Sequence, residues 1–346
     1  MADQTTIEWT ESTWSVITGC TLVSEGCRHC YAAELAATRL KNIPSRKGLA
    51  RKNAAGEAKF TGEVRFNEQW LDQPLRWTRP RKIFVCAHGD LFHESVPDEW
   101  IDRVFAVMAL APQHTFQCLT KRPGRMREYL AATDPAPDAP TMQDRLWRVH
   151  YAMRALSPGV TSHVKTWPLP NVWLGTSVED QATADARIPE LLATPAAVRF
   201  VSAEPLLGPV DIDPYLSPMT VKRSGTIGPG RLFCPRLDWI IVGGESGRRA
   251  RPMHPDWARS LRDQCQAAGV AFLFKQWGAW APDRLALPED LVDARKSLIL
   301  APDGATTSGL MSYPSTSWVT HRVGKKAAGR MLDGRTWDEM PGGGKD

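Results

Sequence analysis

Seven short, mainly apolar runs recur along the chain, and segments long enough for helices separate them. The runs cover residues 14–18, 82–87, 115–119, 171–176, 198–203, 238–242 and 271–274. Their apolar residues are adjacent and do not alternate strictly with polar residues, which is typical of strands buried on both faces of a parallel sheet. The pattern therefore predicts an α/β protein.

The segments between these runs carry helix signals. Residues 97–110 begin with proline and two acids, residues 178–192 have acids early, and residues 255–268 are followed by Gly269, a favourable helix stop. Strand and helix then alternate six or seven times, which predicts a parallel sheet with right-handed crossovers. We expect a parallel (β/α) barrel, full or partial and TIM-like. An open doubly wound sheet is the alternative.

Three regions break the pattern and are expected to be irregular insertions, at about residues 41–63, 134–170 and 214–236. The barrel with its insertions is predicted to span residues 1–281. Residues 282–346 are predicted to form a basic C-terminal appendage that ends in a flexible, glycine-rich tail.

Composition places the chain in a reducing compartment. The polar, acidic N-terminus is not a signal peptide, and the longest apolar stretch is too short to cross a bilayer, so we expect a cytoplasmic protein without a membrane partner. The seven cysteines are odd in number and scattered, which argues against a disulfide framework. Four of them, Cys86, Cys118, Cys234 and Cys265, are expected to be small buried residues.

The net charge of +5 is mild, but its distribution is uneven. Residues 39–52 hold six Lys or Arg and no acid, and residues 321–335 hold five Lys or Arg against one acid. Each segment could follow a phosphate backbone or be an ordinary solvated surface. The aromatic residues Trp147, Tyr151 and Trp167, near Arg148 and His150, could stack on bases.

Three cysteines carry the most specific chemical signal. Cys20, Cys27 and Cys30 follow the first predicted strand with the spacing C-x6-C-x2-C and no fourth cysteine nearby. Three thiolates can hold an iron–sulfur cluster and leave one iron open, whereas a closed structural site usually has four protein ligands. The pattern therefore favours an enzyme. A Cys3His zinc site completed by His29 or His88 is the main alternative.

Polar and ionisable residues follow the ends of the predicted strands. They include His88, Asp90 and His93, then Thr120, Lys121 and Arg122, then Ser177, Glu179 and Asp180, then Ser202 and Glu204, then Glu245 and Ser246, and finally Lys275 and Gln276. An α/β barrel builds its active site on the loops after its strands, so we expect these side chains at one rim. Helix capping by Ser177 and Ser246 would explain only part of this pattern.

The loop Gly19-Cys20…Cys27-Arg28-His29-Cys30-Tyr31-Ala32 resembles that of the radical S-adenosylmethionine superfamily, in its spore-photoproduct-lyase-like branch. Over nearly its whole length the chain resembles an uncharacterised phage and bacterial family named after gene products thirty-seven and sixty-eight of mycobacterial phages. The stretches that carry this resemblance are Thr6-Ile-Glu-Trp-Thr, Ser177-Val-Glu-Asp-Gln, Ser202-Ala-Glu-Pro-Leu-Leu-Gly, Val242-Gly-Gly-Glu-Ser-Gly and Phe274-Lys-Gln-Trp-Gly.

The resemblance implies that Cys20, Cys27 and Cys30 bind a [4Fe-4S] cluster whose fourth iron takes the amino and carboxylate groups of S-adenosyl-L-methionine. The usual first gap in that superfamily is three residues, and here it is six. The superfamily's Gly-Gly-Glu element usually follows the second strand, where this chain has His88-Gly89-Asp90, so Asp90 is assigned to the amino group.

Other strand-end residues are candidates for the same chemistry. Glu179, Glu204 and Glu245 are candidate cofactor or substrate contacts, and Lys275 is a candidate partner for an anionic group. Cys118 is a candidate for returning a hydrogen atom, with a buried structural thiol as the favoured alternative.

Together these expectations describe a radical S-adenosylmethionine enzyme that acts on a nucleobase in DNA or RNA. It would need a reductant such as flavodoxin or ferredoxin, and a separately encoded protein partner is a further expectation. The alternative is a zinc-stabilised, non-catalytic, nucleic-acid-binding protein associated with phages.

Overall fold

The computed structural model describes residues 4–130, 142–159, 164, 166–217, 220–221, 232–233, 235–283, 296–308 and 315–342. Each predicted apolar run contributes a strand, and these strands follow the order β1-β6-β7-β8-β9-β12-β13. Their bounds are β1 (Ser12–Trp14), β6 (Lys82–Val85), β7 (Thr115–Thr120), β8 (Val172–Ser177), β9 (Val198–Ala203), β12 (Trp239–Gly243) and β13 (Ala271–Gln276). The α/β class with a parallel sheet is therefore confirmed.

The chain forms two compact units, and each is described by itself. The first contains residues 1–176 and 193–198, and the second contains residues 177–192 and 199–346. The sequence suggested a division after residue 281, whereas the strands beyond that point belong to the second unit.

In the first unit, β1, β6, β7 and β8 pair in parallel. Trp14, Val85, Cys118 and Leu174 lie in register across these strands, and none is more than 2% exposed. This row explains the apolar runs, because each contributes a side chain to one buried layer. Parallel pairing also brings the carboxyl ends of the strands to one edge, where the loops with ionisable residues begin.

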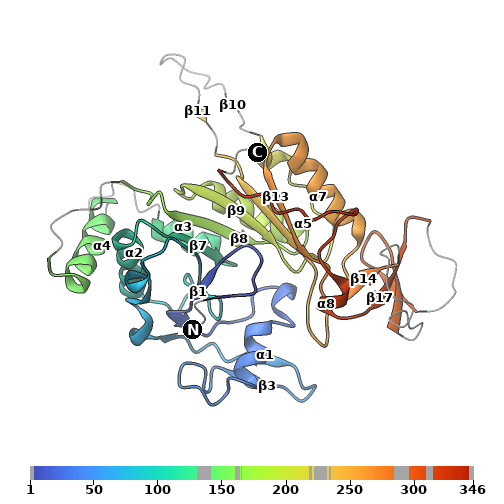
Figure 1. Cartoon of the computed structure of the whole chain (residues 1–346), viewed down its shortest axis with the longest axis horizontal. Helices are drawn as coiled ribbons and strands as arrows, with labels where there is room; N and C mark the ends of the chain where they lie inside the picture. Colours follow the sequence, from blue (N-terminus) through green and yellow to red (C-terminus); the bar gives the residue numbers. More distant parts are fainter. Residues whose placement is uncertain are drawn as a thin grey trace. The chain divides into compact units, whose positions relative to one another are not determined.

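Helices α1 (Tyr31–Ala37), α2 (Asp98–Leu110), α3 (Pro123–Leu130) and α4 (Met142–Leu156) connect the strands of this unit. Figure 1 shows α4 alongside α2. The buried Arg145 of α4 holds this contact, because its guanidinium donates to Asp98 at 2.9 Å and to Asp102 at 3.2 Å. Residues 131–141, 160–163 and 165 of the predicted insertion at 134–170 and its flank lie outside the described residues.

The predicted run at 14–18 is divided in the structure. After β1 the chain enters β2 (Ile17–Thr18), which pairs antiparallel with β5 (Arg65–Phe66) outside the parallel sheet. The insertion at 41–63 contains a hairpin of β3 (Ala50–Lys52) and β4 (Ala58–Phe60) that contacts α1 (Figure 1). Three short 3₁₀ helices complete the unit: η1 (Glu25–Cys27), η2 (Glu68–Trp70) and η3 (Gln73–Arg76).

In the second unit, β9 and β13 flank β12, and both pairings are parallel. All five residues of β12 are buried. Helix α7 (Pro255–Ala268) covers the bounds that the sequence predicted, and Gly269 ends it in the left-handed conformation with φ of 63°. Helices α5 (Gln181–Leu192) and α6 (Asp213–Leu216) also belong to this unit, as does the hairpin of β10 (Thr220–Val221) and β11 (Leu232–Phe233).

The outer edge of β13 is covered by the chain's own C-terminal segment. The Phe274 N–H donates to the Trp337 carbonyl at 3.0 Å, and the Glu339 N–H donates to the Phe272 carbonyl at 3.2 Å. These bonds use backbone groups that a closed ring of parallel strands would need for its next pairing. The structure therefore shows the parallel sheet, and the closed form of the expected barrel is not supported at this edge.

The remaining C-terminal strands form a separate antiparallel sheet in the order β14-β17-β15-β16, with α8 (Lys325–Ala328) following. Their bounds are β14 (Trp280–Pro282), β15 (Ser297–Leu300), β16 (Thr306–Thr307) and β17 (Trp318–Arg322). The end of the predicted flexible tail, residues 343–346, lies outside the described residues. No helix in the described ranges is both long and apolar enough to cross a membrane.

Candidate functional site

Two glycines bring the cysteine loop against the loop that follows β6. Gly19 and Gly89 form a parallel bridge outside the named strands. A Cβ on Gly19 would lie 2.0 Å from a backbone carbonyl oxygen, and one on Gly89 would lie 2.8 Å from another, so neither position has room for a side chain. Gly19 also has φ of +96°, which favours glycine. Because Cys20 and Asp90 directly follow these glycines, the bridge brings them close to each other.

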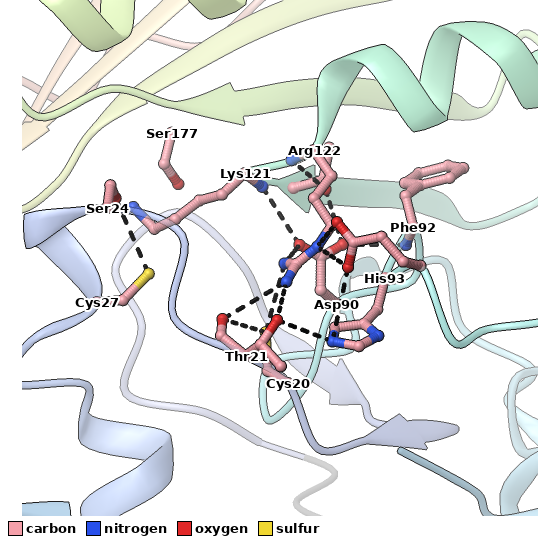
Figure 2. Close-up of polar contacts among 12 residues, drawn as sticks. Cys20, Thr21, Ser24, Cys27, Asp90, Phe92, His93, Lys121, Arg122 and Ser177 are labelled. Carbon is pink, nitrogen blue, oxygen red and sulfur yellow. Dashed lines mark hydrogen bonds and ion pairs between the residues drawn. The ribbon is translucent and has the colours of Figure 1, made fainter. Parts of the chain in front are cut away.

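Asp90 is the centre of a hydrogen-bond network (Figure 2). Its Oδ1 accepts from Thr120 Oγ1 at 2.7 Å and from the Phe92 N–H at 3.0 Å. Its Oδ2 accepts from Arg122 Nη1 at 3.0 Å and from the Lys121 N–H at 3.3 Å. A carboxylate has about four acceptor sites, so these donors use its capacity.

The assignment of Asp90 to a cofactor amino group stays a prediction, and such a ligand would compete with four existing donors. The residue is 5% exposed and its oxygens are already occupied. Its contacts give it a positioning role, because it fixes the guanidinium of Arg122.

Arg122 connects three loops (Figure 2). Its Nε donates to both carboxylate oxygens of Glu94 at 2.8 Å, and its Nη2 donates to Thr21 Oγ1 at 2.5 Å. Its Nη1, which contacts Asp90, also lies 3.5 Å from Cys20 Sγ. A planar guanidinium with five N–H donors suits such a junction, and a lysine could not replace it.

His93, in the loop after β6, also contacts the cysteine loop, through Thr21. Its Nδ1 accepts from the Ser95 N–H at 3.1 Å, which leaves the proton of the neutral ring on Nε2. That nitrogen lies 3.0 Å from Thr21 Oγ1. Burial, and then the nearby Arg122, lower the pKa of His93, which favours this neutral form.

The three cysteines are free and partly exposed. Burial, and then Asp90, raise the pKa of the Cys20 thiol to about 12, although Arg122 opposes the rise. Burial also raises the pKa of Cys30, while the backbone N–H groups of Ala33 and Ala32 and the ammonium group of Lys121 oppose that rise. The opposing groups are those that stabilise a thiolate, the form that binds metals.

The basic insertion holds the second half of the cysteine loop. Lys59 Nζ, on β4, donates to the Arg28 carbonyl at 2.9 Å. Glu57, in the β3–β4 turn, lies 3.8 Å from the Arg28 guanidinium and 4.0 Å from His29 Nε2. Cys30 packs against a small apolar cluster from α1 and the hairpin, which consists of Ala33, Ala36, Ala50 and Ala58.

The cysteine loop supplies three free thiols as possible metal donors. Among the described residues, no three His, Cys, Asp or Glu side chains form a group that could hold a metal ion as they stand. Tetrahedral zinc, with Zn–S distances of about 2.3 Å, requires sulfur atoms within about 4 Å of each other. A cluster keeps its thiolates farther apart because each binds a different iron. Either group would take its sulfur donors from the three free thiols of this loop.

In the second unit, a salt bridge passes over a glycine. Lys275 Nζ on β13 lies 3.0 Å from Glu204 Oε1, which follows β9, and Ser202 Oγ donates to Glu204 Oε2 at 3.1 Å. Between these strands, β12 ends at Gly243, where a Cβ would lie 2.5 Å from Glu204 Oε1. Lys275 and Glu204, predicted as catalytic and cofactor-binding residues, are thus brought together as an ion pair.

The Gly-Gly-Glu sequence after β12 also has a packing explanation. A Cβ on Gly244 would lie 2.0 Å from the Trp277 carbonyl oxygen. Glu245 is 6% exposed and accepts three hydrogen bonds from Arg251, through its backbone N–H, Nε and Nη2, at 2.8–2.9 Å. Gly243, Gly244 and Glu245 therefore bring neighbouring chain segments into close contact.

Glu179 is the most buried of the predicted acids, at 1% exposure. Arg187 Nη1 donates to both of its carboxylate oxygens, at 3.1 and 3.3 Å. Asp180, and not Ser177, caps α5, because Asp180 Oδ1 accepts from the Thr183 N–H at 2.8 Å.

All four acids that the sequence singled out are paired with a cation of their own unit. The pairs are Asp90–Arg122, Glu179–Arg187, Glu204–Lys275 and Glu245–Arg251. Sequence reasoning found the four acids and Lys275, but it gave no role to the three arginine partners. Arg122 stood among the strand-end residues without a role, and nothing in the spacing marked Arg187 or Arg251.

The other described cysteines are buried. Cys118 belongs to the buried row of the first sheet, and burial raises its pKa well above the usual value. These observations favour the structural alternative over hydrogen-atom return. Cys86 and Cys265 are also buried, and Cys234 lies outside the described residues.

The aromatic candidates for base stacking fall into two groups. Trp147 and Tyr151 are 49% and 65% exposed on α4, with ring centroids 6.1 Å apart. Trp167 instead packs against Phe105, with centroids 5.6 Å apart.

The C-terminal basic segment uses several of its cations internally. Arg322 donates to the Gly247 carbonyl at 3.1 Å, Arg330 pairs with Asp338, and Arg335 lies 3.4 Å from the centroid of the Trp337 ring. These contacts give the segment a structural role in the second unit.

Comparison with known proteins identifies a family without an assigned activity. Residues 4–341 match the model of the family described as "Protein of unknown function (DUF5131)". No curated protein matches the chain significantly. The same holds for solved structures. Because the family model spans nearly the whole chain, the protein belongs to the DUF5131 family.

Proposed function

We propose that this protein is a radical S-adenosylmethionine enzyme whose [4Fe-4S] cluster is held by Cys20, Cys27 and Cys30. The observation that carries the proposal is the setting of these thiols. They are free and partly exposed on one loop, and Arg122 and Lys121 place positive charge near Cys20 and Cys30. The other described cysteines are buried. We therefore assign these three thiols to the cluster, whose fourth iron would remain open to a second ligand.

When bound and reduced, the cluster would supply one electron that breaks the sulfur–C5′ bond of S-adenosyl-L-methionine, giving methionine and a 5′-deoxyadenosyl radical that removes a substrate hydrogen. The chain's own residues prepare this site. Arg122 holds Cys20 and Thr21 in place, and Asp90 and Glu94 hold Arg122. These loops follow the carboxyl ends of the parallel strands, which fix where each loop begins. We propose that the sheet is a partial barrel.

The paired acids of the second unit have a less direct part in this proposal. Glu179, Glu204 and Glu245 each bond a cation, so we propose that they set the conformation of strand-end loops. Lys275 remains the candidate for an anionic substrate group, which would have to compete with Glu204. Cys118 keeps only a proposed structural role.

The proposed substrate is a nucleobase in DNA or RNA, supported by the resemblance of the cysteine loop and by the basic residues beside it. The chemistry requires reduced thiols and a one-electron donor such as flavodoxin or ferredoxin, so we propose a cytoplasmic setting. A separately encoded protein partner is compatible with this scheme.

Anaerobic reconstitution tests the proposal. The protein is purified without oxygen, loaded with iron and sulfide, reduced with dithionite and incubated with S-adenosyl-L-methionine. We expect about four irons and four sulfides per chain, and release of 5′-deoxyadenosine. Cys27→Ala should lose both cluster and product, whereas Cys265→Ala, which removes a buried thiol of the second unit, should retain them.

Two results would contradict this function. Zinc without sulfide in oxygen-free protein would favour the zinc-stabilised nucleic-acid-binding alternative. An unchanged yield of 5′-deoxyadenosine in Cys27→Ala would remove the cysteine loop from the chemistry.

A further inference from the structure

Residues 39–52 carry a group of exposed cations without internal partners in the described part of the chain. Arg39, Lys41, Lys47 and Arg51 are exposed, and none of their side chains has an ion pair or hydrogen bond within the described residues. Other exposed arginines of this unit are paired, for example Arg76 with Asp72. Four unpaired cations within thirteen residues create a local positive potential that internal acids do not cancel.

This basic surface adjoins the cysteine loop. The β3–β4 hairpin carries Arg51 and packs against α1, whose first residue follows Cys30. The alanine cluster between hairpin and helix includes Cys30 at its border, and Lys59 bonds the Arg28 carbonyl. The hairpin that carries Arg51 is therefore packed against the segment that begins at Cys30.

An aromatic residue, Tyr31, begins the helix α1 that the hairpin contacts. Tyr31 is 53% exposed although its hydroxyl donates to the Ala87 carbonyl at 2.6 Å, so the ring is fixed while much of it remains open to solvent. Leu22 and Val23, in the cysteine loop itself, are 55% and 40% exposed. Cations that follow a backbone, beside an anchored aromatic ring, are the combination that binds single-stranded nucleic acid.

We propose that Arg39, Lys41, Lys47 and Arg51 bind the phosphate backbone of a single-stranded nucleic acid, and that Tyr31 stacks on one of its bases beside the cysteine loop. An acidic protein would also meet the charge, but it would not require an anchored aromatic ring. Arg322, Arg330 and Arg335 of the other basic segment are used internally, so we place the surface on residues 39–52 and not on that segment. The consequence for catalysis rests on the proposed function, but binding itself does not.

Fluorescence anisotropy with a labelled oligothymidylate tests the surface on the full chain without cluster, over a salt series from about 50 to 200 mM. Each phosphate contact on a single strand contributes about 0.7 to the slope of log K against log salt. The variant R39Q/K41Q/K47Q/R51Q should therefore lower the slope by about 2.8 and weaken binding at least about tenfold at low salt. Tyr31→Leu should weaken binding while leaving the slope unchanged.

The matched control is R79Q/R236Q/R248Q/K326Q, which removes four exposed cations elsewhere. It should retain most of the affinity, and circular dichroism should show that both quadruple variants are folded. Equal losses in the two variants would overturn the location. Binding of polyglutamate without binding of the oligonucleotide would overturn the ligand class and indicate an acidic protein partner.

The outcome is separable from that of the proposed function. Oligonucleotide binding is measured without the cluster, and 5′-deoxyadenosine release is measured without the oligonucleotide. Failure of one therefore leaves the other measurement intact.

Discussion

Nη1 of Arg122 lies between Asp90 Oδ2, at 3.0 Å, and Cys20 Sγ, at 3.5 Å. One guanidinium nitrogen thus joins the loop after β6 to the first cysteine, while the arginine itself follows β7. The position of Cys20 depends on this contact as well as on its own loop. The Arg122–Asp90 ion pair is also buried, so its loss should affect stability.

Arg122→Gln should strongly destabilise the first unit. The substitution leaves the Asp90 carboxylate 5% exposed and without its cation, and breaking such a buried pair typically costs about 3–5 kcal/mol. Arg76→Gln, which breaks an exposed pair with Asp72, is the control and should cost less than about 1 kcal/mol. Urea denaturation followed by circular dichroism measures both, and similar midpoints for the two variants would contradict the role of Arg122.

Gly19→Ala should disrupt the cysteine loop, whereas Gly48→Ala should be tolerated. Both glycines have positive φ, +96° and +83°, so both substitutions carry a backbone cost of about 1–2 kcal/mol. Only at Gly19 would the new Cβ also meet the Glu63 carbonyl oxygen at 2.0 Å, while at Gly48 nothing lies within 4 Å. Both variants carry the cost of positive φ, and only Gly19→Ala adds the clash with the Glu63 carbonyl. The difference between their melting temperatures therefore measures the cost of that clash. Equal decreases in melting temperature would contradict this prediction, because they would mean that the cysteine loop can move to make room for the new methyl group.

Gly243→Ala should be rescued by a second substitution, and Gly244→Ala should not. At Gly243 the new Cβ meets the end of the Glu204 side chain, at 2.5 Å, which Glu204→Ala would remove. At Gly244 it meets the backbone of Trp277 at 2.0 Å, which no side-chain change relieves. We expect the melting temperature of G243A/E204A to exceed that of G243A. If it does not, the salt bridge is not what excludes a side chain from Gly243.

Stability should fall with pH below neutrality, in part through His88. Burial, and then Arg46, lower the pKa of His88 to about 4, whereas an unfolded histidine has a pKa of about 6.5. Between these values the unfolded chain binds a proton that the folded chain does not, so the contribution of His88 is complete above about pH 6.5 and is lost as pH falls towards 4. The loss reaches about 3 kcal/mol at pH 4.

His88→Gln isolates this contribution, because His93 and His254 also have lowered pKa values and remain in the variant. The melting temperature of His88→Gln should therefore decrease less between about pH 7 and 4.5 than that of the parent chain. Parallel curves would assign the acid sensitivity to other groups.

The sequence predicted those elements whose signals are local. The bounds of β9 and α7 agree with the predicted ranges, because a short buried run and a helix ended by Gly269 leave their marks within a few residues. The run at 14–18 was misjudged, because its second half pairs with residues 65–66 and not with the sheet. The residues of a strand do not show which distant segment it pairs with, so the pairing of β2 with β5 could not be predicted from residues 14–18.

The cysteine loop could be located from spacing alone, but the network around it could not. Arg122 meets Cys20 across 102 positions and Asp90 across 32 positions, and both contacts require that three strands already lie in register. The packing role of Gly243-Gly244-Glu245 is hidden in the sequence for a related reason. A motif that looks like a ligand site is explained by the approach of Trp277 and Glu204, which only the folded chain reveals.

Only Lys121 and Arg122 separate the end of β7 from the start of α3. One cation acts on Cys30 and the other on Cys20, so this connection has no spare length. Inserting or deleting a single codon here would rotate both charges away from their sulfurs, even if every other amino acid were kept. The length of this two-residue link is thus a constraint on the evolution of the gene, because insertions and deletions here are expected to be selected against.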